Sequence, residues 1–139
     1  MTSTTSVSRD PVAPWKLWTG RVLSVLPGLA FLPSAAMKLM QKPEFLTAWT
    51  GTFGYPAGTA TPIGIIELAC LALYWVPRTR VLGAILLTGY LGGAISTHVR
   101  AGQPFVIPLV IGIVVWAGLF LRDPRLHALL PLADDSQVK

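Results

Sequence analysis

The most informative segment of the chain reads Thr61-Pro62-Ile63-Gly64-Ile65-Ile66-Glu67-Leu68-Ala69-Cys70-Leu71-Ala72-Leu73-Tyr74-Trp75-Val76. It is apolar almost throughout, and Glu67 near its middle is its only carboxylate. A charged side chain at the centre of a membrane-spanning helix costs about 2.5–3.5 kcal/mol on insertion scales. Glu67 therefore persists there only if another group pairs with it, if it is protonated, or if the protein uses it.

The composition of the whole chain is that of a membrane protein. Of its 139 residues, 53% are hydrophobic and 12% are charged, and the mean hydropathy is +0.60. A soluble domain carries about 25% charged residues, so this chain could not cover a water-exposed surface. Its basic residues, which give a net charge of +5, form no dense patch with interleaved aromatic residues. We therefore expect the lipid bilayer, and no nucleic acid, as a partner.

Long uncharged runs predict an all-α fold, a four-helix bundle embedded in the membrane. A spanning helix needs about 20 residues, with a range of about 17–25. With their flanks, the runs predict spans near 17–40, 60–77, 79–100 and 104–122. We expect a single four-span domain over 17–131, a flexible N-terminal tail over 1–16 and a C-terminal tail over 132–139.

Prolines mark the expected ends of the helices. Thr61 and Pro62 predict the N-cap and the first helical position of the second span. Pro77 falls where that span should end. Pro27 and Pro33 lie inside the first span and should bend it, because neighbouring helices in a membrane can satisfy the carbonyls that a proline frees.

Basic residues predict the orientation. Four spans place both termini on one side, and eight basic residues lie on that side against three on the other. The positive-inside rule then predicts cytoplasmic termini in a multi-pass protein of the inner (plasma) membrane. The eight are Arg9, Lys16, Arg21, Arg78, Arg80, Arg122, Arg125 and Lys139, and the three are Lys38, Lys42 and Arg100.

The connection over 41–60 is the longest between the predicted spans. Its first part is expected to form a short interfacial helix with Phe45, Leu46 and Trp49 on one face. Its second part, over 51–56, contains the glycines and the proline of a turn.

Ionisable groups from three helices are predicted to meet in the outer half of the bundle. Lys38 ends the first span, Glu67 lies about 9–15 Å inside the second, and His98 and Arg100 end the third. Glu67 would be an acid–base or proton-relay group, with Lys38 or Arg100 as its counter-ion. The alternative is a structural ion pair that fixes the helix register.

Helical spacing adds neighbours to this cluster. Tyr74 shares a face with Glu67, and Thr97 shares one with Arg100, whereas His98 points to another side. The predicted catalytic residues are Glu67 and His98, and the predicted ligand-binding residues are Lys38, Arg100, Tyr74 and Thr97. Gly89 and Gly93 form a G-x-x-x-G pair of the type used for close helix packing in lipid.

The chain offers few other chemical groups. Its two histidines, His98 and His127, fall on opposite sides, and Cys70 is its only cysteine. We therefore predict no metal site and no bis-histidine haem site. Redox chemistry would need a bound organic cofactor such as a quinone, or a partner subunit.

The order of several motifs resembles the DoxX-like family of small four-span membrane proteins, over roughly residues 20–131. The motifs are Lys38-Leu39, Gly64-x-x-Glu67-Leu68, Leu73-Tyr74-x-x-Pro77-Arg78-Thr79-Arg80, Leu82-Gly83-Ala84-x-Leu86-Leu87-x-Gly89-Tyr90-Leu91-Gly92-Gly93-Ala94, Thr97-His98-Val99-Arg100 and Leu121-Arg122-Asp123-Pro124-Arg125-Leu126.

The resemblance implies a link to quinone-coupled sulfur oxidation or to oxidative-stress defence, and Glu67, His98 and Arg100 match the family's recurrent polar positions. We therefore expect a quinone-like or other small apolar ligand in a redox-linked process. Glu67 would shuttle a proton, and Arg100 and Lys38 would hold a carbonyl or an anion.

Two alternative functions remain. One is a non-enzymatic accessory or assembly subunit that contacts redox-complex subunits or further copies of itself. The other is a small proton or weak-acid transporter. These residues leave open whether the chain is itself an enzyme.

Overall fold

A computed structural model describes residues 13–126 of the protein. These residues form five α-helices and one short 3-10 helix, with no strand among them. The elements are α1 (Pro14–Met40), α2 (Pro43–Gly51), η1 (Ala57–Thr59), α3 (Ala60–Trp75), α4 (Arg80–Arg100) and α5 (Val106–Arg122). The all-α class is confirmed for this part of the chain. Most of both predicted tails, and His127, lie outside it.

The four long helices match the predicted spans to within three residues at each end. α1 begins at Pro14, earlier than predicted. A proline suits the first helical position, because the N–H that it lacks would have no partner there. α1 then continues through Pro27 and Pro33 as a single helix.

One predicted helix boundary is wrong. The N-cap of α3 is Thr59 rather than Thr61, because η1 runs directly into α3 at Ala60. Thr61 lies inside the first turn, where its hydroxyl accepts a hydrogen bond of 2.7 Å from the side chain of Gln41. This bond ties the end of α1 to the start of α3.

Three helical segments are long and apolar enough to cross a bilayer, namely α1, α4 and Ala57–Trp75, which contains η1 and α3. α5 is a shorter apolar helix of 17 residues, which spans about 26 Å at 1.5 Å per residue. The hydrocarbon core of a bilayer is about 30 Å thick. The number of spans and the side on which the termini lie therefore stay predictions.

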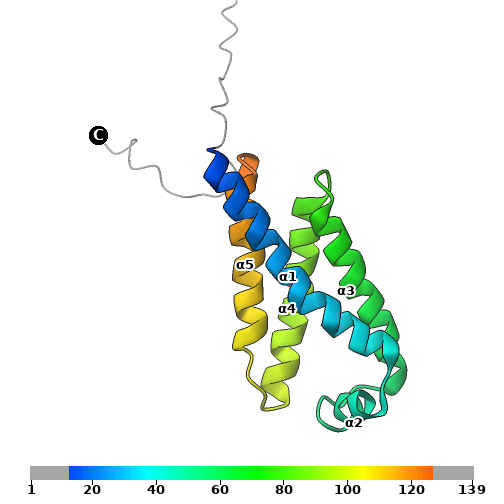
Figure 1. Cartoon of the computed structure of the whole chain (residues 1–139). Coiled ribbons are helices and arrows are strands. Elements are labelled where there is room, and N and C mark those ends of the chain that lie inside the picture. The colour runs from blue at the N-terminus through cyan, green and yellow to red at the C-terminus, as the bar shows by residue number, and fades with distance from the viewer. Residues whose placement is uncertain (1–12, 127–139) are drawn as a thin grey trace, which may run out of the picture.

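The four long helices form a ring in which each one packs against two neighbours (Figure 1). α1 lies opposite α4 and α3 lies opposite α5, since α1 and α4 each pack against both α3 and α5. α1 crosses the bundle obliquely, so that it begins beside α5 and ends beside α3. We call the end that carries α2 the α2 end, and the opposite end, where α1 begins and α5 finishes, the basal end.

The basal half is closely packed, and glycines allow its helices to approach. Where α1 crosses α5, a Cβ added at Gly20 or Gly118 would lie 3.0 Å from atoms of the other helix. A Cβ at Gly83 of α4 would run into the backbone of Tyr74 of α3. These contacts place backbone against backbone, which leaves no room for a cavity at those crossings.

Buried polar groups complete the basal half. The hydroxyl of Tyr74 donates to the carbonyl of Val115 at 2.9 Å, so α3 is joined to α5. Arg80, at the start of α4, forms an ion pair of 3.0 Å with the buried Asp123 that follows α5. The basal half is therefore held by polar contacts between helices as well as by apolar packing.

Candidate functional site

The charged centre of the protein is a buried ion pair between Lys38 of α1 and Glu67 of α3. Nζ of Lys38 lies 3.0 Å from Oε2 of Glu67, and the two side chains are 9% and 1% exposed. The approach depends on Gly64, one turn before Glu67, because a Cβ there would lie 3.0 Å from Cβ of Lys38. Of the two counter-ions that the sequence offered, Lys38 is the one that pairs with Glu67.

Lys38 uses all of its hydrogen-bonding capacity inside the protein. A lysine ammonium has three N–H donors and no acceptor. Besides Glu67, Nζ lies 2.6 Å from the hydroxyl oxygen of Ser34 and 3.4 Å from the carbonyl oxygen of Ser34. Lys38 is thus saturated without a ligand.

Glu67 is only half satisfied. Its Oε1 is buried and has no hydrogen-bond partner within residues 13–126. Tyr90 of α4 interacts with both Glu67 and Ser34, yet its hydroxyl does not complete a hydrogen bond to Oε1. Leaving a buried acceptor unsatisfied costs about 1–3 kcal/mol, and more for a charged group. A donor brought to this oxygen would therefore be stabilising.

A cavity of about 550 Å³ lies beside the ion pair and is lined by all five α-helices and by the loop after α2. Binding pockets for small molecules commonly measure about 300–1,000 Å³. Most of the lining is apolar. The ion pair and four further polar side chains of α1 and α4 also line it, namely Ser34, Tyr90, Thr97 and His98.

Two glycines of α4 create part of this space. Gly89 and Gly93 both line the cavity, and a Cβ added at either would meet nothing within 4 Å. The prediction that this pair packs helices together is therefore wrong within the chain. Close packing depends instead on other glycines, such as Gly64 and Gly83, which face a neighbouring backbone or Cβ directly.

Aromatic side chains close the cavity at the α2 end. We call Phe45, Trp49, Phe53 and Tyr55 the aromatic roof; all four line the cavity. The indole N–H of Trp49 donates to the hydroxyl of Thr59 at 3.1 Å, and the rings of Trp49 and Tyr55 lie 5.0 Å apart. A hydrogen bond of 2.6 Å between the hydroxyls of Tyr55 and Thr97 joins the roof to α4.

His98 lines the same cavity as Glu67, although helical spacing placed it on another face. Its Nδ1 lies 2.8 Å from the carbonyl oxygen of Ala94. A carbonyl can only accept, so Nδ1 donates in this contact. The ring also lies 5.7 Å from that of Phe53 in the roof.

Two of the predicted ligand-binding residues lie away from the cavity. Arg100 donates to the carbonyl of Phe53 at 2.7 Å, and its guanidinium lies 5.2 Å from the ring centre of Tyr55. It braces the roof and is not the counter-ion of Glu67. Tyr74 shares a helical face with Glu67, but seven residues of helix separate them by about 10 Å, so Tyr74 is buried in the basal half.

The cavity reaches the lateral surface of the bundle. α1 diverges from α5 toward the α2 end (Figure 1). Met37 of α1 and Ile107 of α5 line the cavity there, and they are 52% and 68% exposed. Apolar side chains thus frame the space between the two diverging helices.

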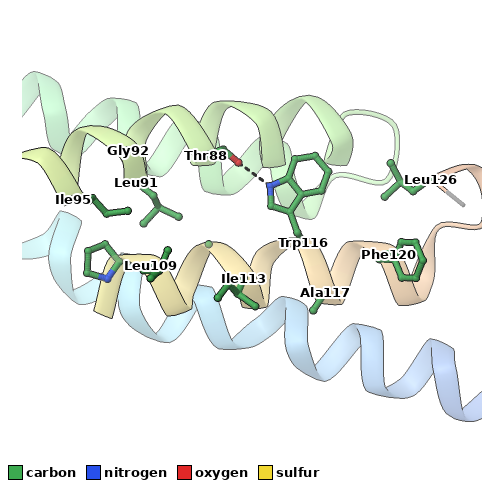
Figure 2. A pocket seen from close by; sticks show the side chains of 12 residues that line it. Thr88, Leu91, Gly92, Ile95, Leu109, Ile113, Trp116, Ala117, Phe120 and Leu126 are labelled. Carbon is green, nitrogen blue, oxygen red and sulfur yellow. Dashed lines mark hydrogen bonds between the residues drawn. The ribbon is translucent and has the colours of Figure 1, made fainter. Parts of the chain in front are cut away.

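A second hollow, of about 710 Å³, is a groove between α4 and α5 (Figure 2). Across it, the indole N–H of Trp116 donates to the hydroxyl of Thr88 at 2.8 Å. Among residues 13–126, no titratable side chain lines this groove. Within the described residues, no three His, Cys, Asp or Glu side chains gather as a metal ion would require.

Ser34 and Tyr90, which complete the polar side of the cavity, were not among the predicted site residues. Helical spacing could have predicted both residues. Ser34 lies one turn before Lys38, and Tyr90 lies seven residues before Thr97 on the same face of α4. The aromatic roof carried no such signal, because its place over the cavity depends on how the loop folds back.

Long apolar helices and a largely apolar exposed surface define a multi-pass, all-α membrane protein. The sequence model of the DoxX-like family matches residues 22–118, which include both members of the ion pair. The chain therefore belongs to the DoxX-like family, as the motif resemblance predicted. Neither a curated protein nor a solved structure is similar enough to this chain to count as a match.

Proposed function

We propose that this DoxX-like protein binds a quinone-like or other small apolar molecule in the cavity beside the Lys38 and Glu67 ion pair, as part of a redox-linked process. Glu67 is the acid–base group of this site, and Tyr90, Thr97 and His98 are its polar neighbours. One observation carries the proposal. A cavity of about 550 Å³ is lined by a carboxylate whose Oε1 is buried and unpartnered within the described chain.

The aromatic roof suits a planar ring. Aromatic rings attract one another in offset or edge-to-face arrangements with centroids about 4.5–7 Å apart. The rings of Trp49 and Phe45 are already 5.3 Å apart, and those of Trp49 and Phe53 are 6.4 Å apart. The ring of a bound ligand beneath the aromatic roof would add to these existing ring contacts.

The proposed setting is the inner (plasma) membrane, with one domain of four spans and both termini cytoplasmic. The basic residues of the basal end, among them Arg21, Arg78 and Arg80, support this orientation. The cavity then lies in the outer half of the bilayer. Its apolar frame at Met37 and Ile107 would admit a molecule dissolved in the lipid.

Mass spectrometry of the purified protein tests the proposal. We expect organic extracts of the wild-type protein to contain a small apolar molecule in near-stoichiometric amount, and extracts of Glu67→Gln to lack it. Asp123→Asn is the matched control, because Asp123 is also a buried, paired carboxylate but lies at the basal end. This variant should retain the molecule.

Two results would contradict the proposal. One is wild-type protein that carries no such molecule and binds no added quinone or other apolar probe. The other is equal loss of the molecule in Glu67→Gln and Asp123→Asn, which would mean that any buried charge change disrupts the fold.

The groove between α4 and α5 favours a second candidate, an accessory subunit of a membrane complex. Gly92 and Gly112 line it, and small residues of this kind allow a partner helix to approach closely. A photocrosslinker at Ile113 in this groove should capture the same partner reproducibly in native membranes, and one at Leu29 on the exposed side of α1 should not. Assembly should tolerate Glu67→Gln.

The close packing of the basal half disfavours the third alternative, a small transporter. A pathway through the bundle would have to pass Leu71 and Tyr74, which are 1% and 0% exposed. Tyr74 is also hydrogen-bonded to Val115 on the facing helix.

A further inference from the structure

We infer that the cavity selects molecules whose polar head donates a hydrogen bond, such as an apolar alcohol or phenol, and that Oε1 of Glu67 receives this bond. The inference rests on the proposed function and narrows its ligand class. Of a quinone and its reduced form, the hydroxyl-bearing reduced form would bind more tightly.

The charged donors near the cavity are already engaged. Lys38 directs its three N–H groups at Glu67 and at the hydroxyl and carbonyl oxygens of Ser34. Arg100 is bound to the carbonyl of Phe53 and does not line the cavity. Neither cation is therefore placed to hold a carbonyl or an anion in the cavity, because Lys38 has no free donor and Arg100 lies outside the lining.

Neutral donors around the cavity are engaged as well. The hydroxyls of Tyr90 and Ser34 interact with each other, and that of Tyr90 also interacts with Glu67. The Thr97 hydroxyl donates to the carbonyl of Gly93 at 2.9 Å, so it accepts the bond from Tyr55. Nδ1 of His98 donates to Ala94. The indole N–H of Trp49 donates to Thr59. A ligand with acceptors alone would find these groups occupied and would have to break an internal bond to use one.

Acceptors remain free at the same place. Oε1 of Glu67 has no partner within residues 13–126 and is held in a side chain that is 1% exposed. His98 also lines the cavity, and in the tautomer protonated at Nδ1 its Nε2 is an acceptor. A hydroxyl head bound at Oε1 would satisfy a buried carboxylate, and a bond to a charged acceptor is among the stronger hydrogen bonds in proteins.

The Tyr90 hydroxyl is the one internal rival. It interacts with Glu67 and Ser34 from α4, so it is a donor already placed beside this carboxylate. The ligand hydroxyl would then compete with Tyr90. Removing this hydroxyl should therefore leave the preference for donors unchanged or increase it.

Two probes of nearly equal shape test the inference. Para-heptylphenol has a hydroxyl donor, whereas para-heptylanisole carries a methyl ether that can only accept. Binding to the full chain in lipid nanodiscs, with empty nanodiscs as the partition blank, should favour the phenol by about tenfold or more. In Glu67→Leu the preference should fall to about twofold or less, and in Tyr90→Phe it should persist.

The outcomes separate the two proposals. Equal binding of both probes, or tighter binding of the anisole, would overturn donor selection and leave a small-ligand site in place. Failure of both probes to bind wild-type protein would count against the proposed function itself. A preference that survives Glu67→Leu but is lost in Tyr90→Phe would assign the contact to Tyr90 and also overturn the inference. If Glu67→Leu does not fold, the comparison of the two probes on wild-type protein still decides.

Discussion

The ion pair between Lys38 and Glu67 is buried, so breaking it should lower the stability of the fold. Both side chains are almost wholly buried, so neither charge can recover its hydration if the other is removed. Replacing both members of a buried pair with apolar residues is often neutral or stabilising, whereas removing one partner costs about 3–5 kcal/mol. The pair is therefore a poor means of gaining stability, and its half-satisfied carboxylate is the feature on which the proposed ligand site rests.

We expect Lys38→Met to destabilise the protein by about 3–5 kcal/mol, because Glu67 loses its counter-ion. The double variant Lys38→Met with Glu67→Leu should recover most of this loss. Reversible unfolding in mixed detergent micelles measures both. A double variant as unstable as the single one would show that the two charges are not coupled.

Some glycines of the bundle allow close packing between helices, and others leave space for the cavity. α4 contains glycines of both kinds. Gly83, at the basal end, allows α4 to touch the backbone of α3, whereas Gly89 and Gly93 leave the cavity open. Gly92, next in the chain to Gly93, lines the groove on the other side. α4 thus packs closely against α3 in the basal half and borders the cavity in the other half, because its glycines lie on different faces and at different depths.

Gly83→Ala should destabilise the bundle by about 1–3 kcal/mol, because the new methyl group meets the Tyr74 backbone and the helices must separate. Gly89→Ala is the matched control. Its methyl group enters open space and should stabilise the helix by roughly 0.5–1 kcal/mol. Thermal unfolding in detergent compares the two, and equal effects would contradict the division of glycines described above.

Gly93→Leu should block the ligand site without unfolding the bundle, because the new side chain would fill part of the cavity. We expect at least about tenfold weaker binding of para-heptylphenol. Gly92→Leu is the control, since it places the same side chain in the groove between α4 and α5. Equal binding by the two variants would exclude the cavity as the binding site.

At the scale of the whole molecule, the path of α1 produces the cavity. Because α1 crosses from α5 to α3 (Figure 1), the bundle closes at the basal end and opens where α1 and α5 diverge. α2 and the loop after it then cover that opening on the α2 side. The cavity is thus open laterally between apolar side chains and covered at its end by the aromatic roof.

Reporter fusions test the proposed topology. If α5 spans the bilayer, reporters at both termini should give cytoplasmic signals. If α5 does not span, the two signals should differ.

Cysteine labelling in a Cys70→Ser background checks the same arrangement from the loops. A cysteine at Thr52 should react with an impermeant reagent in intact cells, and one at Arg78 only after permeabilisation. Labelling of both positions from the same side would contradict the four-span arrangement.

Much of this arrangement was predictable. Uncharged runs placed the four long helices to within three residues at each end, because apolar length is what a bilayer requires. The order of the predicted spans also brought Lys38 and Glu67 into the same half of the bundle, and helical spacing added neighbours to them. The same spacing failed for Tyr74, since a shared face says nothing about depth along the helix. It failed for Arg100 because that side chain turns toward the loop that folds over the bundle.

Local sequence was sufficient for the helices, their apolar surface and the need for a partner to Glu67, because each of these depends on composition or on a short repeat. It could not say which cation would pair, or which glycines would close a contact and which would leave a space. Those outcomes depend on the crossing of α1 over α5 and α3 and on the fold of the loop after α2. They are relations between distant segments, and only the packed bundle sets them.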